Sequence, residues 1–161
     1  MTHYITGDLL TSDCDVLVHQ CNCWGTFGAG IARQIKEQYP EAYYSDQCTL
    51  RGDKTKLGTA VFVHSQGKII VNLYGQYDHG GYGRDGVYVD YKALRRGLQA
   101  VHDACAKPSS QWPTWPKIGM PRIGCALAGG SWARVAKILD DVFGTRPVYI
   151  YTLEGDTSWK E

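Results

Sequence analysis

The sequence predicts an α/β protein of three layers, in which helices cover both faces of a mixed, mostly parallel central sheet. Three observations predict this class. Short apolar runs rich in β-branched residues alternate along the chain with segments of helical spacing. The run Val16–Gln20 is apolar on both alternating faces, as in a strand that is covered from two sides. The turn Ser65-Gln66-Gly67 joins two further strand-like runs and indicates one antiparallel hairpin.

The first third of the chain predicts two strands and two helices. Tyr4–Thr6 is a short first strand, and Val16–Gln20 is the strongest strand of the chain. Ile31, Ile35 and Tyr39 recur four residues apart, which predicts a helix, and Pro40 interrupts that helix. Residues 41–48 predict a second, short helix.

The remaining elements alternate in type. Residues 59–63 and 68–74 predict the two strands of the hairpin, and 75–89 a long loop rich in Gly, Tyr and Asp. Asp90 is expected to cap a helix that runs to Ala106, and Ser131 a helix that runs to Phe143. Short strands are expected at 117–120 and 148–152. Residues 112–116 hold two tryptophans, which either cover an edge of the core or offer a contact surface.

The composition is that of an ordinary globular domain. The 161 residues are 43% hydrophobic and 20% charged, with a net charge of +1. We expect a single domain over 1–161, with a polar tail at 154–161, and a monomer. The N-terminal residues lack the basic start and apolar stretch of a signal peptide, and no apolar run is long enough to span a bilayer, so we expect a cytoplasmic protein without a membrane partner. We interpret Arg95-Arg96 as a solvated helix face, so nucleic acid is not an expected partner.

The six cysteines do not form a known metal motif. The chain has no Cys-x-x-Cys pair, and the spacing does not match that of zinc ribbons or fingers. A chain of this size does not need disulfides to fold, so we expect reduced and mostly buried thiols. We expect neither a metal nor a cofactor.

Two glycine-rich loops carry the functional signal. In Val16–Arg33, a buried strand ends near His19 and Asn22, and the glycines at 28 and 30 then open a helix. Backbone N–H groups at a helix N-terminus favour a phosphate. A second such loop, Pro121–Gly130, also lies between a strand and a helix. Because ligands of parallel sheets bind beyond the carboxyl ends of the strands, we expect both loops at one edge, around a phosphorylated ligand.

Three common phosphate loops are excluded. Arg33 stands where a dinucleotide fingerprint needs its third glycine, and no Gly-Lys-Ser/Thr follows the first loop. No arginine stands six residues after a cysteine, as a cysteine phosphatase loop requires. A single glycine loop could also be a tight turn with a helix cap, but two at one edge favour a ligand.

The loops, taken in order, resemble the macro domain, an ADP-ribose-binding module. Gly7-Asp8-Leu9 is similar to its opening motif, and Tyr151-Thr152-Leu153 to its closing strand. Asn22 with residues 28–32 resembles its first ligand loop, and residues 120–130 its second. The run His19-x-Cys21-Asn22-Cys23 looks most like the branch of ADP-ribose 1''-phosphate phosphatases and the terminal ADP-ribose protein glycohydrolase. Pro40, Asp90-Tyr91 and Trp132 are similar to that group as well.

The resemblance implies a role for each matched position. Asp8 would accept a hydrogen bond from the adenine amino group, the alternative being a plain turn or capping residue. Leu9 would offer its N–H, and Thr152 and Leu153 would flank the adenine. Asn22 would bind the distal ribose, or else form an Asx turn. The pyrophosphate would lie between the two loops, which comprise Gly28, Ala29, Gly30 and Ile31 in the first and Gly124, Cys125, Ala126, Leu127, Ala128, Gly129 and Gly130 in the second.

His19 is the main catalytic candidate. An imidazole can act as general acid or base near neutral pH, and a buried structural histidine is the alternative. Asp78 and His79, in the long loop, are candidates to assist, or they are ordinary polar loop residues. The chain departs from the glycohydrolase, which has a nucleophilic lysine where Gln76 stands and an aspartate where Ala128 stands. A covalent lysine route is therefore not expected.

The resemblance implies a protein that binds ADP-ribose and hydrolyses ADP-ribose 1''-phosphate to ADP-ribose and phosphate. Two alternatives stay open, because the binding residues would be common to all three. One is a non-catalytic ADP-ribose reader or sequestering module. The other is a hydrolase that acts on ADP-ribosylated macromolecules or on O-acetyl-ADP-ribose.

Overall fold

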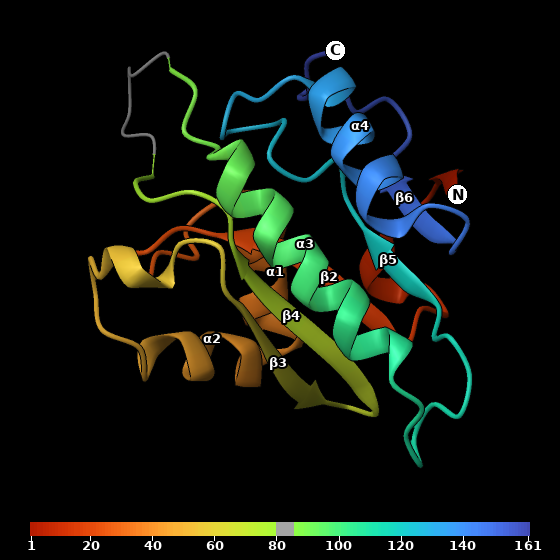
Figure 1. Ribbon diagram of the computed structural model, residues 1–161. Helices are drawn as coiled ribbons and strands as arrows, with labels where there is room; N and C mark the ends of the chain where they lie inside the picture. Colours follow the sequence, from red (N-terminus) through yellow and green to blue (C-terminus); the bar gives the residue numbers. More distant parts are fainter. Residues whose placement is uncertain (80–85) are drawn as a thin grey trace.

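A mixed sheet of six strands forms the middle layer of the computed structural model, which describes residues 1–79 and 86–161 (Figure 1). The strand order is β1-β6-β5-β2-β4-β3. The strands are β1 (Thr2–Thr6), β2 (Val16–Cys21), β3 (Ala60–Ser65), β4 (Lys68–Tyr74), β5 (Ile118–Met120) and β6 (Val148–Thr152). All neighbours pair in parallel except β3, which pairs antiparallel with β4 as the hairpin predicts. The predicted α/β class is confirmed.

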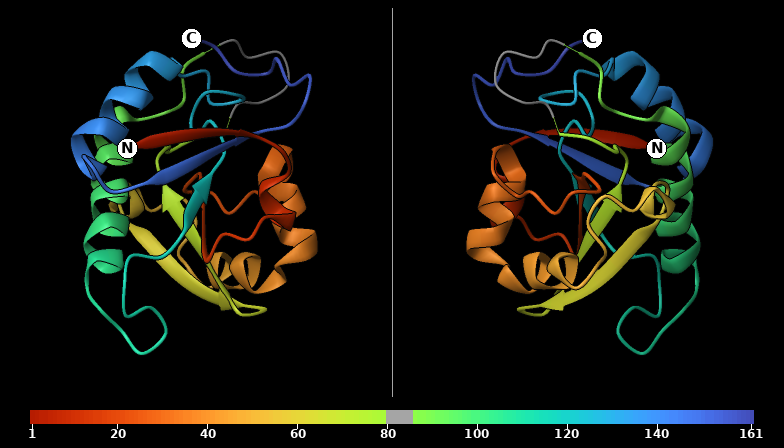
Figure 2. Two further views of the ribbon diagram at one scale, coloured as in Figure 1. Left: turned by 90° about the vertical axis from the view of Figure 1, so that its right-hand side faces the viewer. Right: turned by 90° about the vertical axis from the view of Figure 1, so that its left-hand side faces the viewer.

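Helices cover both faces of the sheet. The helices α1 (Gly30–Gln38) and α2 (Pro40–Gln47) lie on one face, and α3 (Tyr91–Ala106) and α4 (Trp132–Phe143) lie on the other (Figure 2). Two short 3-10 helices, η1 (Leu9–Thr11) and η2 (Lys54–Lys56), lie in the connections. Strand β2 supplies both apolar cores: Val16 and Val18 join the α3–α4 side, and Leu17 joins the α1–α2 side. This explains why the strand begins with three successive apolar residues, Val16 to Val18.

Helix capping agrees with the sequence at one helix and differs at another. The Asp90 carboxylate accepts a hydrogen bond from the Ala93 N–H at 3.0 Å and so caps α3. Ser131 occupies the N-cap position of α4, but its side chain makes no capping hydrogen bond. Part of the predicted 75–89 loop, residues 80–85, lies outside the described residues.

The segment with two tryptophans covers the core. Trp112 and Trp115 are half-buried and pack against the core on the α3–α4 side. The indole N–H of Trp115 donates to the Pro147 carbonyl at 3.0 Å. Of the two possibilities, the core cover is the one that the structure supports.

The C-terminal residues are more than a polar tail. They return to the start of α4, where the Trp132 N–H donates to the Lys160 carbonyl at 2.8 Å. The Trp159 ring lies against the Arg122 guanidinium, 3.7 Å from ring centroid to carbon. This return places Asp156, Ser158 and Trp159 beside the end of β6.

The parallel strands bring their carboxyl ends to one edge of the sheet. The connections after β1, β2, β4, β5 and β6 therefore meet there, and they include both glycine-rich loops. In the described part of the chain, no helix has both the length and the apolar character needed to cross a membrane.

Candidate functional site

A cavity of about 840 Å³ opens at this edge of the sheet. Its volume lies in the range of small-molecule sites, about 300–1,000 Å³. Both glycine loops, the turn after β1 and the end of β6 contribute to the wall. The predicted site residues that line it are Asp8, Leu9, Asn22, Gly28, Ala29, Gly30, Ile31, His79, Gly124, Ala126, Leu127, Ala128, Thr152 and Leu153.

Asp8 both caps a helix and faces the cavity. Its Oδ1 accepts the Leu10 N–H at 2.9 Å at the start of η1, and Leu9 is buried beside it. A carboxylate has two oxygens and several lone pairs, so the cap leaves capacity for a ligand donor. The capping and adenine interpretations of Asp8 are therefore compatible.

Asn22 shapes the first loop from within. Its Oδ1 accepts the Trp24 N–H at 2.9 Å, and its Nδ2 donates to Thr26 Oγ1 at 2.6 Å. Asn22 is 8% exposed and lies in the cavity wall. Both ends of its amide bind the loop, so Asn22 forms the Asx turn, and the ribose contact stays a prediction.

The N-terminus of α1 faces the cavity without a side-chain cap. Ala29 is the N-cap and offers no side-chain hydrogen bond, and Gly30 has a φ of 58°. A Cβ at Gly28 or Gly30 would meet no atom within 4 Å, so no packing contact requires either glycine to lack a side chain. The first N–H groups of a helix have no partner inside the helix and favour an anion.

The second loop is held in shape by its glycines. Gly124 has a φ of 78°, and a Cβ at Gly130 would lie 2.6 Å from the Gly124 carbonyl oxygen. Three residues expected to bind the ligand, Cys125, Gly129 and Gly130, do not line the cavity. Cys125 is buried, and burial raises the pKa of its thiol to about 12. These three residues form the base of the loop, whereas 126–128 face the cavity.

His19 lies behind the cavity wall. It is fully buried and does not line the cavity. Its Nε2 is 2.7 Å from Asn72 Oδ1, and Asn72 Nδ2 donates to the Ala42 carbonyl, so Nε2 carries the proton. Burial lowers the pKa of His19 to about 4, against the smaller, opposite effect of the Asn72 hydrogen bond. A neutral, enclosed imidazole fits the structural interpretation and not the expected acid–base role.

The other two catalytic candidates, Asp78 and His79, differ in their position relative to the cavity. His79 lines the cavity and is exposed, whereas Asp78 does not line it. Asp78 Oδ1 accepts the His79 N–H at 2.8 Å, and the Asp78 carbonyl accepts from Gln76 Nε2 at 2.8 Å. Asp78 therefore supports the turn, and His79 is the histidine that the described residues present to the cavity.

Neither Gln76 nor Cys21 provides an activated nucleophile in the cavity wall. Gln76 Oε1 accepts from Gln20 Nε2 at 2.6 Å, so a neutral amide pair occupies the position of the glycohydrolase lysine. Cys21 also lines the cavity, and burial raises the pKa of its thiol well above the ordinary value. A protonated thiol is a poor nucleophile. Within the described ranges, no three His, Cys, Asp or Glu side chains are grouped to hold a metal ion.

Several residues of the cavity wall were not predicted as ligand contacts. Arg122 packs with its guanidinium 3.7 Å from the Trp159 ring centroid and donates from Nε to Thr152 Oγ1 at 3.3 Å. The sequence held one indication of this contact. Trp159 is a large aromatic residue in an otherwise polar tail, and such a side chain is more stable when it packs against the protein than when water surrounds it. Seven wall residues lie in the matched motifs but were given no ligand role: Gly7, Cys21, Ala32, Pro121, Arg122, Ile123 and Tyr151. The unpredicted wall residues outside those motifs are Gln20, Thr26, Phe27, Gln34, Asp156, Ser158 and Trp159.

Comparisons with known proteins agree with this geometry. The macro domain family model matches residues 18–139. An ADP-ribose 1''-phosphate phosphatase of Meyerozyma guilliermondii is 33% identical over 168 residues, which cover 85% of this chain and 91% of its own. An uncharacterized 17.5 kDa protein of Enterobacteria phage T4 is 30% identical over 144 residues, which cover 85% and 86%. The solved macrodomain of Mycobacterium tuberculosis DarG superposes with a TM-score of 0.72 at 22% identity and covers 94% of this chain and 97% of that one. The chain belongs to the macro domain family.

Proposed function

We propose that this protein binds ADP-ribose in the cavity and hydrolyses ADP-ribose 1''-phosphate to ADP-ribose and phosphate. The observation that carries the proposal is one cavity lined by Asp8, by the uncapped N-terminus of α1 and by the second glycine loop. The 33% identity to a phosphatase of this substrate supports the choice of reaction.

The wall offers a different chemistry at each part of the ligand. Asp8 supplies a carboxylate acceptor for the adenine amino group, beside Thr152 and Leu153. The pyrophosphate is assigned to the N–H groups at the start of α1 and of loop residues 126–128, because both segments line the cavity. We assign the distal ribose and its phosphate to the part of the wall that holds His79, beside the Gln20–Gln76 amide pair.

The reaction needs a proton transfer and stabilisation of phosphate charge. A water oxygen bonds to phosphorus, the bond from phosphorus to the C1'' oxygen breaks, and a proton passes to that oxygen. His79 is the imidazole in the wall, so we assign it as the acid–base residue in place of His19. Preorganised N–H donors and positioning supply the rest of the rate enhancement.

The first prediction is phosphate release from ADP-ribose 1''-phosphate by the purified protein, with saturable dependence on substrate. It is measured with a colorimetric phosphate assay, beside calorimetry with ADP-ribose. Tight ADP-ribose binding without phosphate release would overturn the phosphatase and leave a reader. Release of ADP-ribose from a modified protein or oligonucleotide, without phosphate release, would instead identify a hydrolase of macromolecules.

A second prediction concerns Asp8. We expect Asp8→Asn to weaken ADP-ribose binding by about 10- to 100-fold, because a hydrogen bond to a charged group contributes about 1.5–3 kcal/mol. Calorimetry measures the Kd. The matched control is Asp53→Asn, which changes the same group where Asp53 caps η2, outside the cavity. Asparagine can still cap η1, so an equal unfolding midpoint would separate lost binding from lost folding. Unchanged affinity for ADP-ribose would refute the adenine contact.

A further inference from the structure

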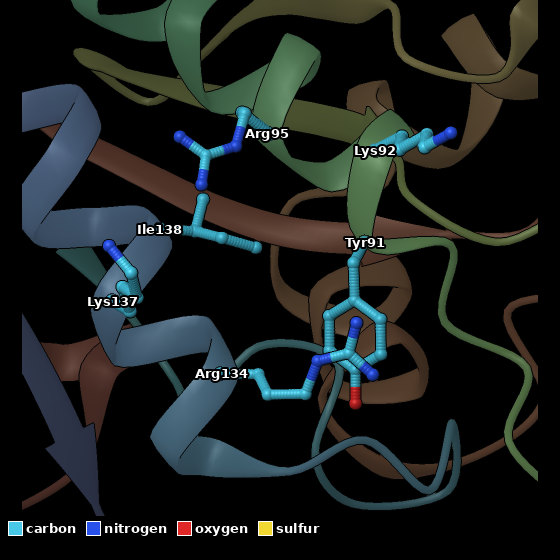
Figure 3. Close-up of a pocket in the computed structure, with 6 residues that line it drawn as sticks. All are labelled: Tyr91, Lys92, Arg95, Arg134, Lys137 and Ile138. Atoms are coloured by element: carbon cyan, nitrogen blue, oxygen red, sulfur yellow. The ribbon is translucent and has the colours of Figure 1, made fainter.

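A second hollow, of about 270 Å³, lies between α3 and α4 and shares no wall residue with the cavity. Figure 3 shows the side chains around it: the Arg134 guanidinium lies against the Tyr91 ring, Arg95 reaches towards α4, and Lys92 points away from α4. The residues that line it are Tyr91, Lys92, Arg95, Arg134, Lys137 and Ile138. Four of the six are cationic, in a chain whose net charge is only +1. We call this hollow the α3–α4 groove.

The positive charge of the groove is only partly neutralised. Asp141 contacts two of the cations, Arg95 at 3.0 Å and Lys137 at 3.3 Å. The Arg134 guanidinium lies 3.7 Å from the Tyr91 ring centroid, a contact that holds the side chain but leaves its charge in place. The side chains of Arg95 and Lys137 are 46% and 75% exposed, so their N–H groups remain available to a ligand.

The cations are arranged along the helices. Arg134 stacks on Tyr91 in the first turn of α3, and Arg95 reaches Asp141 one turn further on. α3 and α4 therefore run side by side in the same direction, as Figure 1 shows. One helical turn advances about 5.4 Å, so the charges form successive steps along the groove. Both helix N-termini lie at one end and add positive potential there.

We propose that the α3–α4 groove binds the phosphate backbone of a single-stranded nucleic acid. Guanidinium groups bind phosphate oxygens in pairs, and a row of stepped cations suits a chain of repeated phosphates better than one small anion. The hollow is too small to admit a duplex. One face of the Tyr91 ring is covered by Arg134, and its hydroxyl accepts the Ser131 N–H. The contact is therefore electrostatic, without preference for base sequence.

The groove could not be predicted from the sequence, because its cations come from two helices that are far apart along the chain. Arg95 and Arg96 are adjacent, but Arg96 turns away and donates to the Leu57 carbonyl at 2.9 Å. The partners of Arg95 in the groove, Arg134 and Lys137, lie on another helix. The expectation that nucleic acid is no partner rested on the net charge of +1, on the lack of a basic face in the sequence, and on the interpretation of Arg95-Arg96 as a solvated helix face.

The test is fluorescence anisotropy with a labelled single-stranded 15-nucleotide DNA of mixed sequence, at low salt. We compare the protein with the double variant Lys92→Glu/Lys137→Glu. The control is Lys36→Glu/Lys107→Glu, which makes the same charge change at exposed lysines outside the groove. We expect at least about tenfold weaker binding by the groove variant and a salt slope reduced by about one per lysine. The control is expected to bind nearly as the unchanged protein does.

Three results would overturn the proposal. The first is no binding of the oligonucleotide by the unchanged protein. The second is an equal loss of affinity in the groove and control variants, which would indicate diffuse attraction. The third comes from competition with ADP-ribose. Binding in the presence of saturating ADP-ribose separates the groove from the cavity: displacement of the oligonucleotide would assign it to the cavity and overturn the groove. The proposal does not depend on the phosphatase activity.

Discussion

Replacing His79 by alanine is expected to lower kcat for phosphate release from ADP-ribose 1''-phosphate by about 10²–10⁴-fold. The affinity for ADP-ribose should stay nearly unchanged, because the imidazole is assigned to proton transfer and not to binding. His79 lines the cavity and is exposed, so its removal leaves no buried gap. Steady-state kinetics and calorimetry on the same preparation measure the two quantities.

A matched control is His64→Ala, which removes an exposed histidine from β3, outside the cavity. Its kcat should equal that of the unchanged protein. An unchanged kcat in His79→Ala would remove His79 from the chemistry and leave positioning by backbone N–H groups as the main contribution. A loss of ADP-ribose affinity equal to the loss in kcat would make His79 a binding residue.

Acid is expected to destabilise the fold through His19. Burial holds the pKa of this imidazole at about 4, against an ordinary value of 6.5. Between pH 6.5 and pH 4, His19 is therefore protonated in the unfolded chain but neutral in the folded one. The free energy of unfolding falls as the pH drops through this range. At pH 5 the loss is about 2 kcal/mol relative to neutral pH, because each pKa unit is worth about 1.36 kcal/mol. Urea unfolding at pH 7 and pH 5 measures it.

The variant His19→Gln isolates this effect. Glutamine can still donate to Asn72 Oδ1 from its amide but does not titrate, so its stability should change little between pH 7 and pH 5. Carboxylates respond mainly at lower pH, which is why the comparison stops at pH 5. An acid loss that persists in His19→Gln would show that another group is responsible.

The architecture could be predicted from the sequence because it depends on patterns within short segments of the chain. The doubly covered strand β2, the hairpin and the Asp90 cap are properties of short segments, and each is found in the structure. The common edge of the two glycine loops followed from the parallel sheet alone, and the cavity lies there.

The side chains at the site were harder to predict because their depth depends on distant partners. His19 still lies inside β2, where both faces are covered, whereas Gln20 and Cys21 reach the cavity at the end of that strand. The pattern that identified a doubly covered strand thus contained the evidence against His19 as a catalytic residue. Trp159 reaches the wall only because the chain returns to the start of α4, a contact that no local pattern encodes.

The pairing of β1 with β6 has a consequence for folding. Asp8 follows the first strand of the sequence and Thr152 ends the last, and both line the same cavity. Contacts between such distant segments cost the most loop-closure entropy, so topologies rich in them fold slowly. The cavity is complete only when this edge of the sheet has closed. ADP-ribose should therefore bind only chains that have finished folding, and at about 100 times its Kd it would stabilise them by about 2.7 kcal/mol.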